Sequence, residues 1–214
     1  MLSVVAACTA AYCSPAQEAS RLCHSASGVR YIAESRVLCI DGELDEKKEI
    51  RKAVLSQNFD KDLRVVIRSP GGYLRDAIDI TLHLEKFGYD VIVDGICASA
   101  CAQFIFFGAE NKYIINNGVV AVHGGPMSDA QIDALDYDDS AKRNLKNEQA
   151  EFIAFYKERK IELGITRDFP ERLIKDLAAG QIVFWIPKEQ DYQKYGVKNI
   201  RYCDAKYRDP DNVK

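Results

Sequence analysis

The feature that most constrains the fold is an alternation of short apolar runs with segments of helical spacing in the first half of the chain. Residues 36–40, 63–67 and 90–94 are rich in apolar side chains, as expected of strands in a sheet that is buried on both faces. Residues 44–59 and 77–88 lie between them and carry apolar side chains at helical spacing. The order strand, helix, strand, helix, strand predicts right-handed βαβ units and a mostly parallel sheet in an α/β fold.

The rest of the chain continues this alternation. Helices are predicted at residues 100–107, 128–163, 169–177 and 189–195, and strands at residues 112–115, 119–122 and 182–185. The segment 128–163 is long and strongly charged, so we expect one long helix or a helical hairpin there.

A length of 214 residues suffices for one domain with a sizeable core and would be cramped for two. Residues 1–30 are rich in Ala, Ser and Cys without a sustained period, and we interpret them as a leader or a loosely held arm. Residues 31–214 are then a single domain. The net charge is −3 and the Lys and Arg residues are scattered, so nothing in the charge distribution indicates nucleic-acid binding.

The chain contains seven cysteines, and their spacing helps to indicate the cellular compartment in which the protein works. None forms a Cys-x-x-Cys pair, so the spacing gives little support for a zinc site, and we predict neither a metal nor a cofactor. Disulfides in an oxidising compartment are the commoner alternative. If Cys8 is lipidated or removed, six cysteines remain, which is enough for three bridges.

The first residues point to export. Residues 5–8 (Val-Ala-Ala-Cys) resemble the lipobox of bacterial lipoproteins, in which the cysteine is lipidated after cleavage. The apolar run before Cys8 is short and lacks a basic region, as it would if the signal began further upstream. We therefore expect a periplasmic or otherwise exported protein, with Cys8 as the candidate lipidation site and membrane anchor. An ordinary N-terminus with incidental thiols is the alternative. No later segment is a transmembrane candidate, because the most apolar stretch, residues 96–108, is short and carries polar side chains.

One stretch of the chain holds the groups that acyl transfer needs: a nucleophile, a base and donors for an oxyanion. Ser99 follows the third predicted strand and begins the next helix, where its side chain is exposed. His123 follows the strand 119–122 and is flanked by glycine. The other two histidines are weaker candidates, because His24 lies in the arm and His83 lies within a helix.

The oxyanion donors are expected at the turn Gly71-Gly72, directly after the strand 63–67. No side chain blocks the glycine amides, and the amide of Ala100 at the start of a helix can complete the pair. Each piece alone has an ordinary structural explanation as a turn, a helix cap or a packing residue. Their combination in this order favours an active site.

These pieces carry a resemblance to a known family. The stretch 36–123 resembles the proteolytic subunit of the Clp protease, the wider ClpP/crotonase superfamily, and in particular exported ClpP-like proteins of bacteria. The matching pieces are Ile-Asp-Gly at 40–42, Ile-Arg-Ser-Pro-Gly-Gly at 67–72, Gly-Ile-Cys-Ala-Ser at 95–99, Gly108 and Val122-His123. Weaker similarity extends to residues 184–189 and 195–196.

The resemblance implies the ββα superhelix of that superfamily and a peptide or protein substrate. It assigns Ser99 as the nucleophile, His123 as the general base, and Gly72 with Ala100 as the oxyanion donors. In the family a helical segment after the histidine mediates ring assembly, which makes a homo-oligomer through residues 127–163 a hypothesis. A solvated helix with local salt bridges is the alternative.

The sequence departs from the family at the third catalytic position, where Ile182 stands in place of an aspartate. Either a Ser–His dyad operates, or a substitute such as Asp168 or Asp176 orients His123.

The second departure is the pair Cys97 and Cys101, which flanks Ser99. The two residues either close a small disulfide that stiffens the turn or remain buried thiols.

The sequence leaves three functions open. The first is a serine hydrolase, specifically a peptidase that acts outside the cytoplasm without an ATPase partner. The second is a binding or assembly module that has lost activity together with the aspartate. The third is a crotonase-type acyl-CoA enzyme, for which the sequence offers no acidic catalytic residues near the oxyanion donors.

Overall fold

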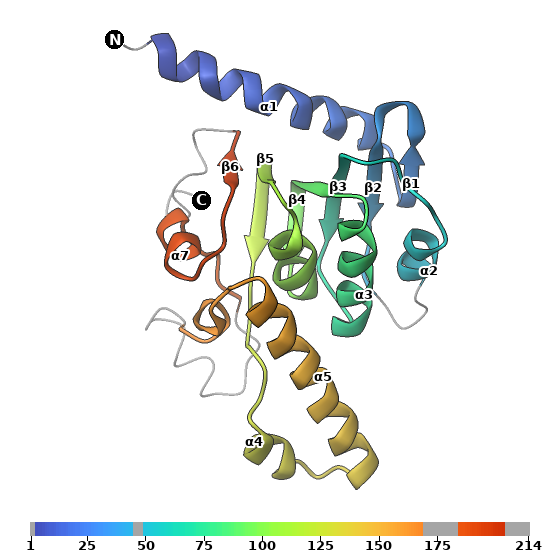
Figure 1. The fold of residues 1–214 in the computed structure, drawn as a ribbon, viewed down its shortest axis with the longest axis vertical. Coiled ribbons are helices and arrows are strands. Elements are labelled where there is room, and N and C mark those ends of the chain that lie inside the picture. Colours follow the sequence, from blue (N-terminus) through green and yellow to red (C-terminus); the bar gives the residue numbers. More distant parts are fainter. Residues whose placement is uncertain (1–2, 45–48, 169–183, 204–214) are drawn as a thin grey trace.

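The computed structural model describes residues 3–44, 49–168 and 184–203, and the side chains from residue 13 onward within those ranges. Within them, one six-stranded sheet has the order β1-β2-β3-β4-β5-β6 (Figure 1). β1 is antiparallel to β2, and each later neighbouring pair is parallel. The predicted α/β fold with a mostly parallel sheet is therefore confirmed. The strands are β1 Gly28–Ile32, β2 Val37–Asp41, β3 Leu63–Ser69, β4 Tyr89–Ala98, β5 Lys112–Ala121 and β6 Ile200–Tyr202.

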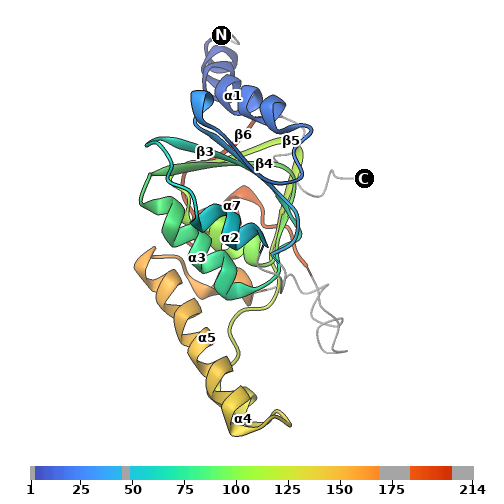
Figure 2. The ribbon, with the colours of Figure 1, turned by 90° about the vertical axis from the view of Figure 1, so that its right-hand side faces the viewer.

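Helices cover both faces of the sheet, as Figure 2 shows in side view. α1 (Ser3–Cys23) lies across one face, and α2 (Glu49–Leu55), α3 (Leu74–Glu85) and a π-helix (Cys101–Phe106) lie against the other. The middle of β3 is buried on both sides because of these two layers, which explains its nearly continuous apolar sequence.

Residues 1–30 are more ordered than the sequence analysis predicted. Most of the segment forms α1 and the start of β1. Ala16, Ala19 and Cys23 are buried at helical spacing, and their small side chains allow α1 to lie close to the sheet. Two disulfides, Cys13–Cys203 and Cys23–Cys39, fasten the helix at both ends of this contact. The described part of the segment is thus not a loosely held arm, whereas the division of the chain at residue 30 stays a prediction.

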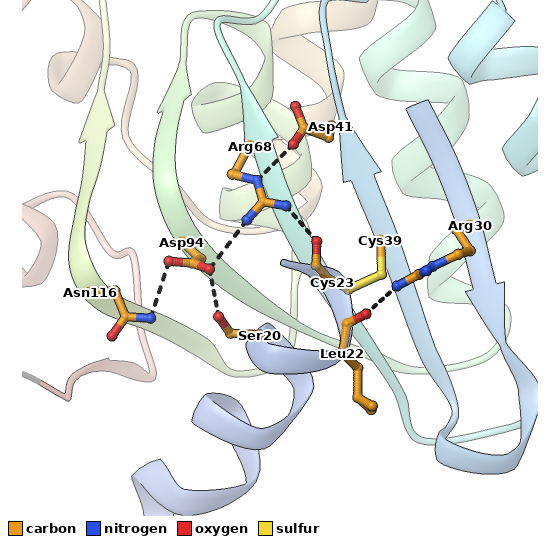
Figure 3. A network of polar contacts seen from close by, with 9 residues as sticks. All are labelled: Ser20, Leu22, Cys23, Arg30, Cys39, Asp41, Arg68, Asp94 and Asn116. Atoms are coloured by element: carbon orange, nitrogen blue, oxygen red, sulfur yellow. Dashed lines mark hydrogen bonds and ion pairs between the residues drawn. A yellow bond between two sulfur atoms is a disulfide. The ribbon is translucent and has the colours of Figure 1, made fainter. Parts of the chain in front are cut away.

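A polar network joins the C-terminal end of α1 to the sheet (Figure 3). Arg68 on β3 donates from Nε to Asp41 at 2.7 Å and from Nη2 to the carbonyl oxygen of Cys23 at 2.7 Å. Its Nη1 lies 3.4 Å from Asp94 on β4. The hydroxyl of Ser20 donates to the same Asp94 carboxylate at 2.5 Å. The network therefore connects α1 with three neighbouring strands close to the ends that lead into the Gly71-Gly72 turn and Ser99.

The predicted long helical segment is a hairpin of two helices, α4 (Asp129–Asp133) and α5 (Asp139–Glu158). The side chains of Ser128 and Asp138 cap the two N-termini. The hairpin projects from the body of the molecule, and only the C-terminal end of α5 lies near the helices on the sheet (Figures 1 and 2).

Other predicted elements differ in length. Of the helix predicted over 44–59, the structure describes Glu49–Leu55, while residues 45–48 lie outside the described residues. The two strands predicted at 112–115 and 119–122 form one strand, β5, which is interrupted by positive φ angles at Asn116 and Asn117. The last predicted helix corresponds to α7 (Glu189–Lys194). The predicted helix 169–177 and most of the predicted strand 182–185 lie outside the described residues.

Candidate active site

Ser99 occupies a sharp turn between β4 and the helix that follows. Its φ is +53°, a left-handed conformation that is unusual for a residue with a side chain and that occurs preferentially at functional sites. The backbone N–H of Ser99 donates to the carbonyl oxygen of Ala121 at 2.9 Å. This bond fixes the turn against the end of β5. The strand-to-helix turn thereby presents the hydroxyl away from the backbone of its own strand.

His123 meets Ser99 because β4 and β5 run parallel and in register. Ala98 pairs with Ala121, so the residues that follow these two strands are neighbours at the same edge of the sheet. Ser99 Oγ lies 2.5 Å from Nε2 of His123, which is hydrogen-bond distance. The two residues that the sequence analysis singled out are therefore in direct contact.

The surroundings of His123 favour its neutral form. The ring is half-buried, and burial lowers its pKa from the ordinary value of 6.5 because the charged imidazolium is poorly solvated there. The ring of Phe184 packs edge-on against it with a centroid distance of 4.9 Å. A neutral imidazole whose Nε2 faces a hydroxyl can accept the proton of that hydroxyl.

Gly72 lies opposite Ser99 in a conformation that only glycine permits. Its φ is +135°, and a Cβ at this position would lie 2.0 Å from the carbonyl oxygen of Leu44. Leu44 bonds to the residues on either side, accepting from the N–H of Tyr73 at 2.7 Å and donating to the carbonyl oxygen of Gly71 at 2.8 Å. The bridge between Leu44 and Gly72 therefore uses the N–H of Tyr73 and the carbonyl oxygen of Gly71, and not the N–H of Gly72.

Ala100 supplies the second candidate donor. It directly follows Ser99 at the start of the helix, where backbone N–H groups have no partner within the helix. Gly71 brings the two candidate donors together, because the position of its absent Cβ lies 3.0 Å from the nitrogen of Ala100. The four predicted residues Ser99, His123, Gly72 and Ala100 are thus gathered at one edge of the sheet.

A family comparison matches this region. The model of the Clp protease family matches residues 21–168 of the chain. The chain belongs to the Clp protease family. The match covers both glycines, Ser99, His123 and the projecting helical hairpin. Membership supports a function of the serine-peptidase type, and members of the family act on peptide substrates and oligomerise.

The cysteines that flank the serine of this Clp-family protein form a disulfide, Cys97–Cys101, and are both fully buried. The bridge spans the turn that holds Ser99. It also joins the end of β4 to the first residue of the π-helix, where the sequence analysis had predicted an ordinary helix. π-Helical turns occur often at functional sites. Cys97 and Cys101 are therefore bridged and are not two buried thiols.

The third catalytic group is not found among the described residues. Within them, no hydrogen bond or ion pair links a carboxylate to His123. Asp168, one of the two predicted substitutes, instead accepts a hydrogen bond from the hydroxyl of Tyr195 at 2.8 Å. The other substitute, Asp176, lies outside the described residues, as does Ile182. Among the residues described, no cluster of three or more His, Cys, Asp or Glu side chains could hold a metal ion.

Gln103 is a site residue that was not predicted from the sequence. Its side chain is buried, with 4% exposed, and its Nε2 donates to the carbonyl oxygen of His123 at 2.5 Å. A lone amide within an otherwise apolar helix was the available signal, but the residue that accepts its hydrogen bond could not be deduced from the sequence.

Substitution of Gly71 tests the close packing of the two turns. A Cβ at Gly71 would lie 2.6 Å from the Cβ of Ser99 and 2.5 Å from the carbonyl oxygen of Ala98. Gly71→Ala should therefore displace the serine turn and slow the labelling of Ser99 by a fluorophosphonate about 100-fold. Gly28→Ala is the matched control, because Gly28 also has a positive φ (+72°) but a Cβ there has nothing within 4 Å, and its labelling rate should be unchanged. Equal rates in the two variants would contradict the assigned geometry.

Proposed function

We propose that this protein is a serine peptidase in which Ser99 attacks the carbonyl carbon of a peptide bond. The observation that carries the proposal is the 2.5 Å contact between Ser99 Oγ and His123 Nε2 at a turn with positive φ. As the Oγ–C bond forms, His123 takes the hydroxyl proton, and the N–H groups of Gly72 and Ala100 stabilise the oxyanion. An oxyanion-hole donor typically contributes about 3–4 kcal/mol to transition-state stabilisation.

The remaining steps use the same residues. The protonated His123 gives its proton to the leaving amine as the C–N bond breaks, and an acyl ester remains on Ser99. His123 then takes a proton from water, whose oxygen attacks the ester, and Ser99 recovers its proton as the ester bond breaks.

His123 would act in this scheme with its lowered pKa. It is neutral, and therefore able to accept a proton, at neutral pH. Without an orienting carboxylate the rate of such a pair is lower by up to about 10⁴-fold. The packing of Phe184 against the ring limits its rotation and offsets part of this loss.

A second candidate is a catalytically weak or inactive binding and assembly module. It is favoured by a single observation, the lack of a carboxylate contact to His123 among the described residues. In that case the protein would act only by binding or assembly through its surface, and His123→Ala would leave its function intact.

We further propose that the protein works outside the cytoplasm, without an ATPase partner. Three disulfides support an oxidising compartment. They use six of the seven cysteines, and Cys8 remains, in the segment that resembles a lipobox. Among the described helices, none has the length and apolar character to cross a bilayer. Lipidation of Cys8 is proposed as the mode of anchoring on the ground of the lipobox-like sequence at residues 5–8.

Homo-oligomerisation through residues 127–163 is also proposed. The hairpin of α4 and α5 extends from the body and carries exposed apolar side chains, Tyr137 at 58% and Ile153 at 42% exposure. Exposed apolar side chains on a projecting element suit an interface between subunits.

Active-site labelling tests the peptidase proposal. A fluorophosphonate should label the wild-type protein at Ser99, and Ser99→Ala should abolish the labelling. His123→Ala should slow it by about 10²–10⁴-fold, because the general base is lost. Ser56→Ala, at an exposed serine directly after α2, is the control and should be labelled at the wild-type rate. A folded, oxidised sample that is not labelled would overturn the proposal.

The pH dependence of the same reaction reports on the base. Burial lowers the pKa of His123, so more of the imidazole is neutral at a given acidic pH than for an exposed histidine. The labelling rate should therefore fall on acidification with a midpoint below the ordinary value of 6.5. A fall centred above 6.5 would contradict the assigned environment of His123.

The anchoring proposal is tested on the mature protein isolated from cells that produce it from its full-length gene. Intact-mass measurement should find a chain that begins at Cys8 and carries a lipid. The variant Cys8→Ser should lack the lipid and leave the membrane fraction. A mature chain that begins beyond Cys23 would contradict the proposal, since it could not contain two of the three disulfides.

The assembly proposal is tested by molecular mass in solution. Light scattering should find an oligomer for the wild-type protein and a monomer for the double variant Tyr137→Asp/Ile153→Lys. Lys86→Asp, an exposed substitution on the body, should leave the mass unchanged. A monomeric wild-type protein, or a double variant that keeps its mass, would contradict the proposed interface.

A further inference from the structure

Gln103 has an uncommon position for a polar residue. It lies in the π-helix among side chains that are almost all apolar and fully buried, and only 4% of it is exposed. Burying an amide in such surroundings costs free energy unless its polar atoms are hydrogen-bonded. The partners of Gln103 therefore indicate why an amide occupies this position.

These partners belong to the two central residues of the active site. The backbone N–H of Gln103 donates to the carbonyl oxygen of Ser99 at 2.9 Å. Its side-chain Nε2 donates to the carbonyl oxygen of His123 at 2.5 Å and lies 3.4 Å from that of Gly124. Together with the contact between Ser99 Oγ and His123 Nε2, these bonds form a closed ring through three residues.

The backbone after His123 needs such a contact. The parallel pairing of β4 with β5 ends at Ala98 and Ala121, and Val122 forms a single bridge with Trp185. His123 is followed by Gly124 and Gly125, which restrict the backbone least of all residues. Among the described residues, Gln103 is the hydrogen-bond donor to the carbonyl of His123.

We propose that Gln103 is a positioning residue that holds the backbone of His123 against the helix carrying Ser99, and so keeps the base in reach of the nucleophile. The inference rests on the proposed peptidase function. An amide suits the task because its NH₂ group offers two donors to two carbonyl oxygens without bringing a charge into the core. A carboxylate at the same position has no donor when ionised, and an apolar side chain has none at all.

The test compares Gln103→Met with the wild-type protein in saturation kinetics of fluorophosphonate labelling. Methionine has a similar length but cannot donate to the carbonyl of His123. The maximal labelling rate should fall about 10–100-fold while the half-saturating probe concentration stays constant, because probe binding does not need the base in place. Gln57→Met is the control: Gln57, in the segment after α2, makes the same kind of bond, from Nε2 to the carbonyl oxygen of Ala53 at 2.9 Å. Its labelling rate should be unchanged.

Two outcomes would overturn the inference. One is an unchanged maximal rate in Gln103→Met, and the other is an equal loss in Gln57→Met, which would indicate a general effect on stability. If Gln103→Met does not fold, Gln103→Asn keeps the buried amide but is one methylene too short to reach His123, and the same fall in rate is expected.

NMR, which needs no covalent labelling, distinguishes a failure of this inference from a failure of the proposed function. If the wild-type protein is not labelled, the peptidase proposal fails, and the positioning role is judged by NMR of the His123 ring. The ring should give one sharp set of resonances in the wild-type protein and in Gln57→Met, and several or broadened sets in Gln103→Met. Identical His123 spectra in all three proteins would overturn the inference.

Discussion

The parallel pairing of β4 with β5 is the interaction on which the site depends. Its register places Ala98 beside Ala121, so Ser99 and His123 follow their strands at the same edge of the sheet. The neighbouring pair, β3 with β4, brings the Gly71-Gly72 turn to that edge as well. Each strand contributes one chemical function at its carboxyl end, which is the common location of sites in open α/β sheets. A shift of register would separate the turn of Ser99 from the end of β5 that carries His123.

Three disulfides and a polar network stabilise the part of the sheet that carries the site. Cys97–Cys101 spans the turn of Ser99, while Cys13–Cys203 and Cys23–Cys39 fasten α1 across the opposite face. Arg68 links α1 to β2, β3 and β4 just before the last two strands lead into the site (Figure 3). Bridges of this kind stabilise mainly by restricting the unfolded chain, typically by about 2–4 kcal/mol each. They suit a protein whose serine turn is strained, because backbone strain persists only where the surroundings enforce it.

The proposed chemistry relies on a histidine that is oriented by neutral contacts. Among the described residues, the contacts of His123 are to Ser99, to the ring of Phe184 and to the amide of Gln103. Burial lowers the pKa of the imidazole, which favours its neutral, proton-accepting form. A pair of Ser99 and His123 without a carboxylate would stabilise the imidazolium less than a full triad, and lower activity would be expected of it.

The sequence by itself determined the central strands β2 to β5 with their helices, their parallel pairing, and Ser99, His123, Gly72 and Ala100 as site candidates, whereas α1, β1 and β6 were not predicted. These features are local: apolar periodicity, glycines at strand ends and small residues around the serine can be read within short windows. Tertiary structure alone decided the rest. It packed α1 on the sheet, because Ala16 and Ala19 gain stability only against strands distant in sequence, and it chose the pairing of the cysteines, which no spacing specifies. It also gave Gln103 its partner, because a hydrogen bond between a helix and the end of a separate strand exists only once both are placed.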